Sequence, residues 1–217
     1  FEAHEKGIKL AVATGRTLSV IYNVIDQLPF LDYVIYSNGA AVCDLKTAKT
    51  VYEDYMPAET ALDIFKFLSR FPAYFEFYQD GKQHAQNGRE KYFTGMDLPQ
   101  EFLDSYAAST IMHDDIMTLA DKNVEKINLF YFGGEYYDEI KNYLFSHSGI
   151  DCTSPVSGDI EMTAKGVDKA KALEGLCSEL GIDSSEVMAF GDADNDLGML
   201  EFAGYGTAME NAAHMQG

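Results

Sequence analysis

Apolar residues near both ends of the chain form short continuous runs that alternate with segments of helical periodicity. Residues 8–13 and 33–36 are two such runs, and between them apolar residues recur at helical spacing over residues 17–28. Continuous apolar runs of this length are typical of strands that a parallel sheet buries on both faces. A strand, a helix and a second strand in this order predict a βαβ unit.

The C-terminal quarter of the chain repeats this alternation. Apolar residues recur at helical spacing over residues 168–180, and Gly181 marks the end of that helix. The run at 187–190 predicts a further buried strand, and residues 197–203 have the pattern of a helix that follows it. We therefore expect parallel α/β structure to return at residue 161.

The residues between these segments have a different pattern, in which hairpin-like strands mix with amphipathic helices and many Tyr and Phe side chains. The expected strands are a hairpin at 40–55, a half-buried strand at 73–78 and a strand at 126–132, and the expected helices are 57–71, 100–108 and 135–145. The polar residues 83–92 predict no clear element. We predict a doubly wound parallel-sheet core, residues 1–53 and 163–217, interrupted by an inserted α+β domain, residues 54–162.

The composition narrows the class of protein. The formal net charge of −19 repels nucleic acid and anionic lipid, so we expect neither nucleic acid nor a membrane as a partner. Three widely spaced cysteines without a CxxC pair indicate reduced thiols in a cytoplasmic protein. We expect a monomer or a weak homodimer. Because the net charge is negative, local Lys and Arg residues would have to attract any anionic substrate.

The acidic hexapeptide 191–196 (Gly-Asp-Ala-Asp-Asn-Asp) follows a predicted strand and precedes a predicted helix. Its carboxylates repel one another unless a cation lies among them, and Mg²⁺ prefers such oxygen ligands. A calcium loop of the EF-hand type would need Gly at its sixth position and Glu at its twelfth, where this chain has Leu197 and Ala203. A second alternative is that Asn195 or Asp196 merely caps the following helix, which would explain one polar residue but not the cluster.

Two further turns follow predicted core strands, and a lysine lies at the start of a predicted helix. The turn Thr14-Gly15-Arg16 offers a hydroxyl, backbone amides and a guanidinium to phosphate oxygens, and Asn38 follows the next strand. Lys169 lies in the first helical turn, where the helix dipole disfavours a cation unless an anion binds there. Each feature has a simpler interpretation. Thr14 would be a loop residue or a cap, Asn38-Gly39 a common turn, and Lys169 a solvated surface lysine. Together these features suit phosphoryl transfer, although no nucleophile is evident.

Four segments resemble successive motifs of the haloacid dehalogenase superfamily. They are residues 13–16 (Ala-Thr-Gly-Arg), 37–40 (Ser-Asn-Gly-Ala), 165–169 (Lys-Gly-Val-Asp-Lys) and 191–196. The branch they resemble is the Cof-type (subfamily IIB) phosphatases, which carry a large α/β cap after the second core motif, and residues 203–212 resemble the stretch after the last motif. The resemblance implies a Mg²⁺-dependent hydrolase of small phosphorylated metabolites such as sugar phosphates.

The resemblance also implies roles for individual residues on the phosphate side of the site. Thr14 would donate a hydrogen bond to the transferring phosphoryl group, with Gly15 and Arg16 in the same loop. Lys169 would neutralise the nucleophile and the phosphate. Asn38 would line the substrate entrance.

On the metal side, the resemblance implies that Asp192 binds Mg²⁺ directly and that Asp196 holds a metal-bound water. Asn195 would orient the phosphate or the lysine. The family's first motif, DxDGT, supplies an aspartate nucleophile that forms an aspartyl-phosphate, and the 217 residues do not contain it. We expect that motif upstream, since the chain begins at Phe1 in what resembles a clipped helix, and we expect this stretch alone to be inactive. A phosphosugar mutase and a non-catalytic phosphometabolite-binding protein stay open as alternatives.

Overall fold

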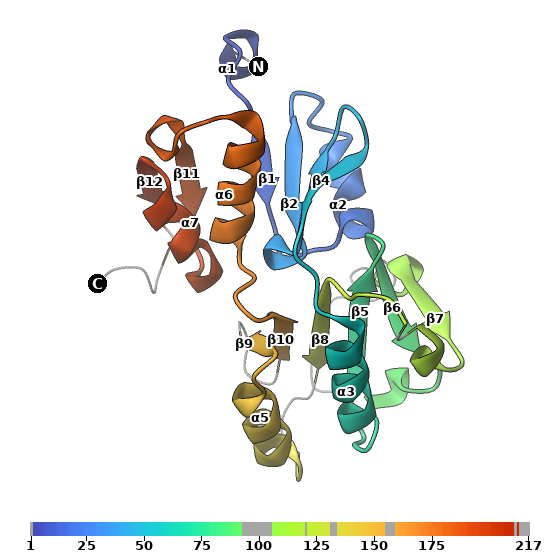
Figure 1. The fold of residues 1–217 in the computed structure, drawn as a ribbon. Coiled ribbons are helices and arrows are strands. Elements are labelled where there is room, and N and C mark those ends of the chain that lie inside the picture. Colours follow the sequence, from blue (N-terminus) through green and yellow to red (C-terminus); the bar gives the residue numbers. More distant parts are fainter. Residues whose placement is uncertain are drawn as a thin grey trace. The chain divides into compact units, whose positions relative to one another are not determined.

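The computed structural model describes residues 2–92, 106–119, 121–130, 134–154, 159–210 and 212. The chain divides into two compact units, each assembled from segments that are distant in sequence (Figure 1). The first unit holds Phe1–Arg16, Asn23–Asp54 and Val167–Gly217, and the second holds Thr17–Tyr22 and Tyr55–Gly166. Within the described residues, no helix combines the length and the apolar character needed to cross a bilayer.

The N-terminal half of the first unit forms a four-stranded sheet in the order β1-β2-β3-β4. Its elements are α1 (Glu2–Glu5), β1 (Ala11–Ala13), the end of α2 (Leu18–Ile25), β2 (Tyr33–Tyr36), the 3₁₀ turn η1 (Ser37–Gly39), β3 (Ala41–Asp44) and β4 (Lys49–Glu53). Strands β1 and β2 are parallel and β2, β3 and β4 are antiparallel, so the predicted βαβ unit and the predicted hairpin are confirmed. The prediction that residues 8–13 are buried is wrong, because β1 is short and, among the described residues, pairs only with β2, with Ala11 exposed.

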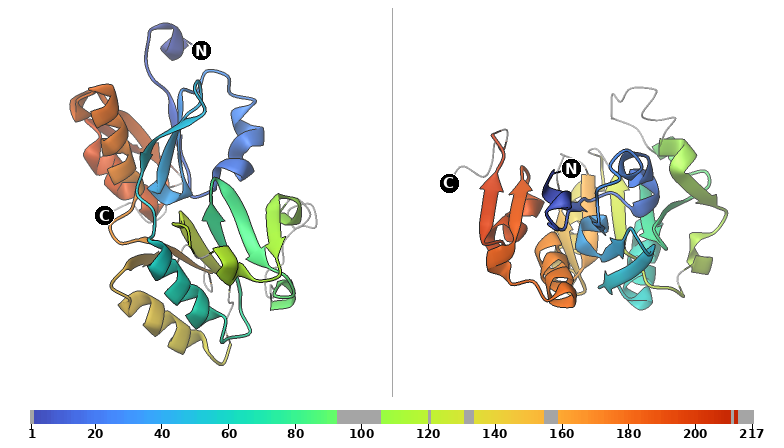
Figure 2. Two further views of the ribbon diagram at one scale, coloured as in Figure 1. Left: turned by 45° about the vertical axis from the view of Figure 1, so that its right-hand side comes forward. Right: turned by 90° about the horizontal axis from the view of Figure 1, so that it is seen from above.

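The C-terminal half of the first unit has the predicted helix–strand–helix order. Its elements are α6 (Lys169–Leu180), the 3₁₀ turn η4 (Ser184–Glu186), β11 (Met188–Gly191), the 3₁₀ turn η5 (Asp194–Asp196), α7 (Leu197–Phe202) and β12 (Tyr205–Ala208). Gly181 ends α6 in the left-handed conformation at φ 65°, as predicted. Helices α6 and α7 lie side by side in Figures 1 and 2, and the core of this unit is shared by α6 and strands β2 and β3.

Strand β11 pairs in parallel with β12, which the apolar pattern did not predict. Alternate residues of β11 are exposed, including Met188 and Phe190, so the prediction that this strand is buried on both faces is wrong. The reason is that β11 pairs with a single neighbour in a two-stranded sheet, and in the described residues no ladder joins that sheet to the four-stranded one.

The second unit is built on a six-stranded sheet in the order β7-β6-β5-β8-β10-β9. Its elements are α3 (Ala58–Leu68), β5 (Tyr74–Gln79), β6 (Lys82–Gln86), the 3₁₀ turn η2 (Glu90–Tyr92), β7 (Thr110–His113), the 3₁₀ turn η3 (Ile116–Leu119), β8 (Lys126–Phe130), α5 (Tyr137–Ser146), β9 (Ile150–Thr153) and β10 (Asp159–Ala164). All of its ladders are antiparallel except the one between β6 and β7.

Two sequence expectations fail in this unit, and one strand lies where no element was predicted. Strand β5 is buried along its whole length rather than half-buried, because Phe75 and Phe77 pack on Phe65 of α3 while the opposite face carries a polar network. Strand β6 lies in the segment without a predicted element. Strand β10 is antiparallel to both of its neighbours, so parallel structure does not return at residue 161. Most of the helix expected at 100–108 lies outside the described residues.

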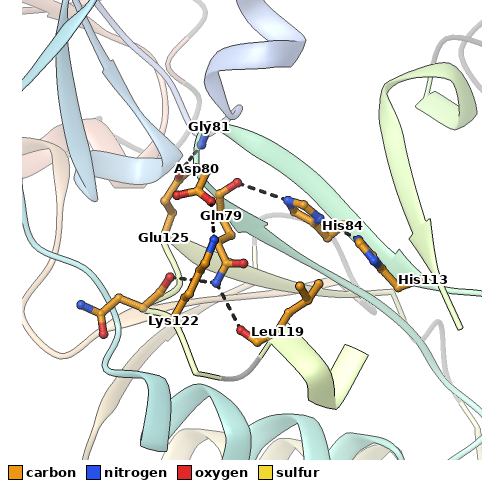
Figure 3. Close-up of polar contacts among 9 residues, drawn as sticks. Gln79, Asp80, Gly81, His84, His113, Leu119, Lys122 and Glu125 are labelled. Atoms are coloured by element: carbon orange, nitrogen blue, oxygen red, sulfur yellow. Dashed lines mark hydrogen bonds and ion pairs between the residues drawn. The ribbon is translucent and has the colours of Figure 1, made fainter. Parts of the chain in front are cut away.

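The first residues of α2 are held by a hairpin of the second unit. Asp80 and Gly81 form the two-residue turn between β5 and β6, with positive φ at both positions as a type I′ turn requires. The buried carboxylate of Glu125 accepts hydrogen bonds from the Gly81 backbone N–H at 2.6 Å (Figure 3) and from the Thr17 hydroxyl at 3.4 Å. The backbone N–H of Ser19 in turn donates to the Gly81 carbonyl at 2.9 Å. The start of α2 therefore belongs to the second compact unit.

Candidate functional site

The turns that follow β1 and β2 lie against each other because these strands are parallel and in register. The Thr14 backbone N–H donates to the Ile35 carbonyl at 2.9 Å, and the Asn38 backbone N–H donates to the Thr14 carbonyl at 3.1 Å. The Ser37 backbone N–H donates to the Arg16 carbonyl at 3.0 Å. The Thr14 hydroxyl oxygen accepts from the Arg16 backbone N–H at 3.1 Å, which leaves the hydroxyl proton for another acceptor.

The turn after β2 has an unusual backbone that places it close to α6. Ser37, Asn38 and Gly39 all have positive φ, at 51°, 59° and 98°. Non-glycine residues adopt this conformation at a cost, and such strain gathers at functional sites. A Cβ atom on Gly39 would lie 2.1 Å from the Asp168 carbonyl oxygen and 2.8 Å from the Lys169 nitrogen. Glycine at this position therefore allows the turn to pack directly on the first residues of α6.

Lys169 and Asp196 form a buried ion pair, with the lysine Nζ 2.6 Å from the Asp196 Oδ1 atom. Each residue is only 6% exposed. The Asp196 Oδ2 atom accepts from the backbone N–H groups of Asp192 at 3.1 Å and Ala193 at 3.3 Å. Burial raises the pKa of Asp196, but the Lys169 ammonium and these N–H groups outweigh it, so the pKa lies below its usual range. The pair thus fixes the acidic loop onto the helix start.

An amide contact joins the acidic loop to the turn after β2. The Asn195 Nδ2 atom donates to the Asn38 Oδ1 atom at 3.4 Å. A Cβ atom on Gly15 would lie 2.6 Å from that same Oδ1 atom, so the absence of a side chain at Gly15 makes room for the asparagine. Contacts thus join Thr14 to Arg16 and Asn38, and Asn38 to Asn195. Lys169, Asp196 and Asp192 form a second group, which the peptide bond between Asn195 and Asp196 joins to the first.

The structure excludes two of the simpler interpretations. Lys169 is not a solvated surface lysine, unlike Lys165 and Lys171, which are exposed and pair with Asp151 and Asp54. Asp196 does not cap α7 through its side chain, because its carboxylate accepts from the loop that precedes it. The ion pair was not predicted from the sequence. The available signal was that Asp196 and Lys169 both belong to turns and helix starts where charged groups bind ligands or one another.

The oxygen atoms of the acidic loop fit a hard cation such as Mg²⁺. Mg²⁺ is often held by only one or two carboxylates together with water and substrate phosphate oxygens. Asp192 is exposed at the end of β11, and Asp196 retains one acceptor site beside the three hydrogen bonds that it accepts. Asn195 adds a buried Oδ1 atom that accepts no hydrogen bond from the described residues. Within the described part of the chain, no three His, Cys, Asp or Glu side chains gather as a metal cage, so substrate and water would supply the remaining ligands.

The family profile described as haloacid dehalogenase-like hydrolase matches residues 2–215. The chain is 27% identical over 227 residues to the 5-amino-6-(5-phospho-D-ribitylamino)uracil phosphatase YwtE of Bacillus subtilis, covering 97% of this chain and 78% of that protein. It is 27% identical over 213 residues to the HMP-PP phosphatase of Escherichia fergusonii, covering 96% of this chain and 74% of that protein.

Solved structures show the same fold. A haloacid dehalogenase-like hydrolase from B. subtilis superimposes with a TM-score of 0.80 at 25% identity, covering 97% of this chain and 80% of that one. A haloacid dehalogenase-like hydrolase from Bacteroides thetaiotaomicron gives a TM-score of 0.81 at 23% identity, covering 98% and 79%. The predicted α/β class is therefore confirmed. The two relatives above are phosphatases, and the chain belongs to the haloacid dehalogenase-like hydrolases.

Proposed function

We propose that this chain carries the phosphate-binding and metal-binding parts of an active site that hydrolyses small phosphorylated metabolites, sugar phosphates among them, with Mg²⁺. The observation that carries the proposal is the buried Lys169–Asp196 pair and its connection through Asn195 and Asn38 to the Thr14 loop. Phosphoryl transfer depends on positioning and on positive charge beside the transferring group. An ammonium held in place by a buried carboxylate meets that need at a fixed position.

Each residue of the network has a chemical part in this proposal. The Thr14 hydroxyl would donate to a phosphoryl oxygen, and the Lys169 ammonium would neutralise the phosphate. Asp192 would be a direct Mg²⁺ ligand, and bound Mg²⁺ would supply charge neutralisation to the phosphate. Asp196 would hold Lys169 and a metal-bound water, while Asn195 and Asn38 would orient the groups around the phosphate.

The 217 residues hold no DxDGT motif, so the proposal needs a nucleophile from elsewhere in the complete protein. We propose that a DxDGT motif upstream supplies an aspartate that attacks the phosphorus atom and releases the alcohol, after which water hydrolyses the aspartyl-phosphate. The phosphatase names of the relatives favour hydrolysis over phosphosugar mutase activity. The first compact unit would be the core, and residues 54–162 of the inserted segment would be the cap that reads the leaving group.

The proposal places the protein in the cytoplasm, as a monomer or weak homodimer that needs neither nucleic acid nor membrane. Its support is the net charge of −19 and the free thiols of Cys43, Cys152 and Cys177. The experiment is a phosphate-release screen of the complete protein against many phosphorylated metabolites, with Mg²⁺ and with EDTA. Release that needs Mg²⁺ is expected, and no release from any compound would contradict the proposal.

A further inference from the structure

A pair of histidines joins strands β6 and β7 in the sheet of the second unit (Figure 3). Among the described residues, β7 pairs with β6 alone, in the one parallel ladder of that sheet. His113 ends β7 and lies opposite Gln86, two positions from His84 on β6, so both histidine side chains are on the same face. The His84 Nδ1 atom lies 2.9 Å from the His113 Nε2 atom. The histidine pair thus links the two strands through their side chains.

His84 is held in one orientation by its surroundings. It is 8% exposed, and its ring lies against Phe77 of β5, with the centroids 5.2 Å apart and the planes inclined by 17°. Its Nε2 atom lies 3.2 Å from the Gln79 backbone carbonyl oxygen. The Gln79 side chain in turn donates to the Asn123 carbonyl at 3.1 Å. The His84 ring therefore cannot turn away from His113 without losing a buried hydrogen bond.

The contact with Gln79 decides which nitrogen atoms of the histidine pair carry protons. A carbonyl oxygen only accepts, so the His84 Nε2 atom carries a proton, and in the neutral ring the Nδ1 atom has a lone pair. The His113 Nε2 atom must therefore donate to it. The ring centroids are 5.1 Å apart and the planes inclined by 26°, so the nitrogen atoms meet at nearly coplanar ring edges. One proton thus lies between the two rings.

The histidine pair can take up one further proton without losing this bond, but not two. A first proton on the outer Nδ1 atom of His113 leaves the bond between the rings intact. A second would have to bind the His84 Nδ1 atom, and two N–H groups of two cations would then face each other at 2.9 Å. Two separate histidines in water have no such limit, and each takes up a proton at about pH 6.5. Acid therefore favours the separated pair over the bonded one.

The surroundings of His84 add to this preference. Burial lowers its pKa, and the charges of His113 and Lys82 lower it further, while its bond to a backbone carbonyl and the charge of Asp80 raise it. Asp80 is exposed and pairs with Lys122 at 3.3 Å, so its carboxylate is shared with another cation. A proton on the inner nitrogen of His84 is therefore poorly compensated.

The other bonds at this end of β7 involve exposed groups. Asn87 donates from its backbone N–H to the His113 carbonyl at 2.8 Å and from its side-chain amide to the exposed Asp114 carboxylate at 2.7 Å. Strand β7 has four residues, and its Ile111 and Met112 side chains are exposed. Short, exposed elements open locally at low cost in free energy. Loss of the bond between the histidines would therefore free the end of β7.

We propose that the histidine pair is a pH-sensitive switch in the second unit. With one proton between the rings it ties the end of β7 to β6, and uptake of a second proton there in mild acid releases that end. Release would uncover backbone N–H and C=O groups of β6, which are a template for pairing with another strand. The proposed phosphate chemistry uses neither histidine, so this inference stands apart from it.

Hydrogen exchange in the complete protein, from about pH 8 to about pH 5, tests the switch on both sides of the ordinary histidine pKa. We expect the protection factors of the β7 amides, corrected for the intrinsic exchange rate at each pH, to fall below about pH 6.5. The fall should approach about tenfold per pH unit, because opening takes up one proton. The amides of β8, in the middle of the same sheet, should not follow it.

A pair of substitutions assigns the effect to the histidines. His113→Gln removes one titrating ring while its amide can still donate to His84, so the β7 protection should become nearly independent of pH. His147→Gln is the matched control, because His147 is a half-buried histidine of the same unit that follows α5 and lies outside the sheet. It should keep the wild-type pH profile of β7.

Nitrogen NMR tests the proton positions without any substitution. At about pH 8, above the ordinary histidine pKa, His84 should have a protonated Nε2 atom and a bare Nδ1 atom that is scalar-coupled to the His113 Nε2 atom. The opposite tautomer of His84, or β7 protection that follows that of β8 at every pH, would overturn the inference. A wild-type pH profile of β7 in folded His113→Gln would overturn it as well.

Discussion

The Lys169 Nζ atom and the Asp196 Oδ1 atom lie 2.6 Å apart, and both side chains are buried. The lysine begins α6, and the aspartate also accepts hydrogen bonds from the backbone of the loop after β11. One ion pair therefore holds the helix start and the acidic loop together. Each partner depends on the other, since an isolated buried charge is far more costly than a paired one.

Removing the carboxylate should show this dependence. Asp196→Ala leaves the Lys169 ammonium buried without its partner and removes the acceptor of two backbone N–H groups. We expect the free energy of unfolding to fall by about 3–5 kcal/mol in urea denaturation. Asp194→Ala, which changes an exposed carboxylate two residues away, should alter it by about 0.5 kcal/mol or less. Equal losses in the two variants would show that the Lys169–Asp196 pair does not stabilise the fold more than an exposed carboxylate does.

The same pair has a pH dependence of known sign. The folded state holds the pKa of Asp196 below its unfolded value of about 3.9, so the folded state binds fewer protons at this group. The stability that ionised Asp196 adds to the folded state is fully present above that unfolded pKa. This stability is lost as the pH falls through the folded pKa. The stability difference between the wild type and Asp196→Asn should therefore shrink in acid, and a difference that grows below pH 4 would contradict this assignment.

The turn after β2 offers a test of its close approach to α6. Gly39→Ala adds a Cβ atom where the Asp168 carbonyl oxygen would be 2.1 Å away, at a φ of 98°. Overpacking and left-handed strain together should cost about 2–5 kcal/mol in the free energy of unfolding. Gly88→Ala is the matched control, because its φ is 79° and no atom lies within 4 Å of the added carbon. It should show only the strain of about 1–2 kcal/mol.

Glu76 predicts the opposite pH trend from Asp196. Because burial raises its pKa to about 8, the folded state binds the proton more tightly than the unfolded state does. Stability should therefore fall as the pH rises from about 4.3, the unfolded value, to about 8. Glu76→Gln should remove this slope, so its stability relative to the wild type should be greater at pH 8 than at pH 5. Glu139→Gln on the exposed surface of α5 should leave the slope in place.

Much of the first unit follows from local sequence pattern, and much of the second does not. Apolar runs and turn residues predicted β2, the β3–β4 hairpin and α6, because each is specified by neighbours within a few positions. The pairing of β10 with β8 and β9, by contrast, is decided by strands far away in sequence. The burial of Glu76 depends on donors from three strands, which no local pattern reveals.

The candidate site shows the same division. The turns that carry its residues were predictable, since their chemistry lies within each motif. The Lys169–Asp196 pair spans 27 positions, and the contact of Asn195 with Asn38 spans 157, so neither could be read from spacing alone. The positive φ values of Ser37 and Asn38 also escaped prediction, because neither residue requires that conformation.

Substrate choice should follow the inserted segment, residues 54–162, because the network of the candidate site lies outside it. Replacing this segment in the complete protein by that of a related phosphatase should change the order of kcat/KM values across a panel of sugar phosphates. Turnover of the substrates that fit the new segment should remain, since the proposed chemistry stays with the core. An unchanged order would mean that the core reads the substrate.

The most direct test of the central claim is Mg²⁺-dependent phosphate release by the complete protein and its Asp192→Ala variant. The variant loses a direct metal ligand but also loses repulsion within the acidic loop, so its melting temperature should stay the same or rise. We predict that its kcat/KM at ordinary Mg²⁺ falls by more than about 100-fold, beyond the loss typical of outer-shell residues. Asp194→Ala should retain most activity. Full turnover by a folded Asp192→Ala protein at ordinary Mg²⁺ would contradict the account.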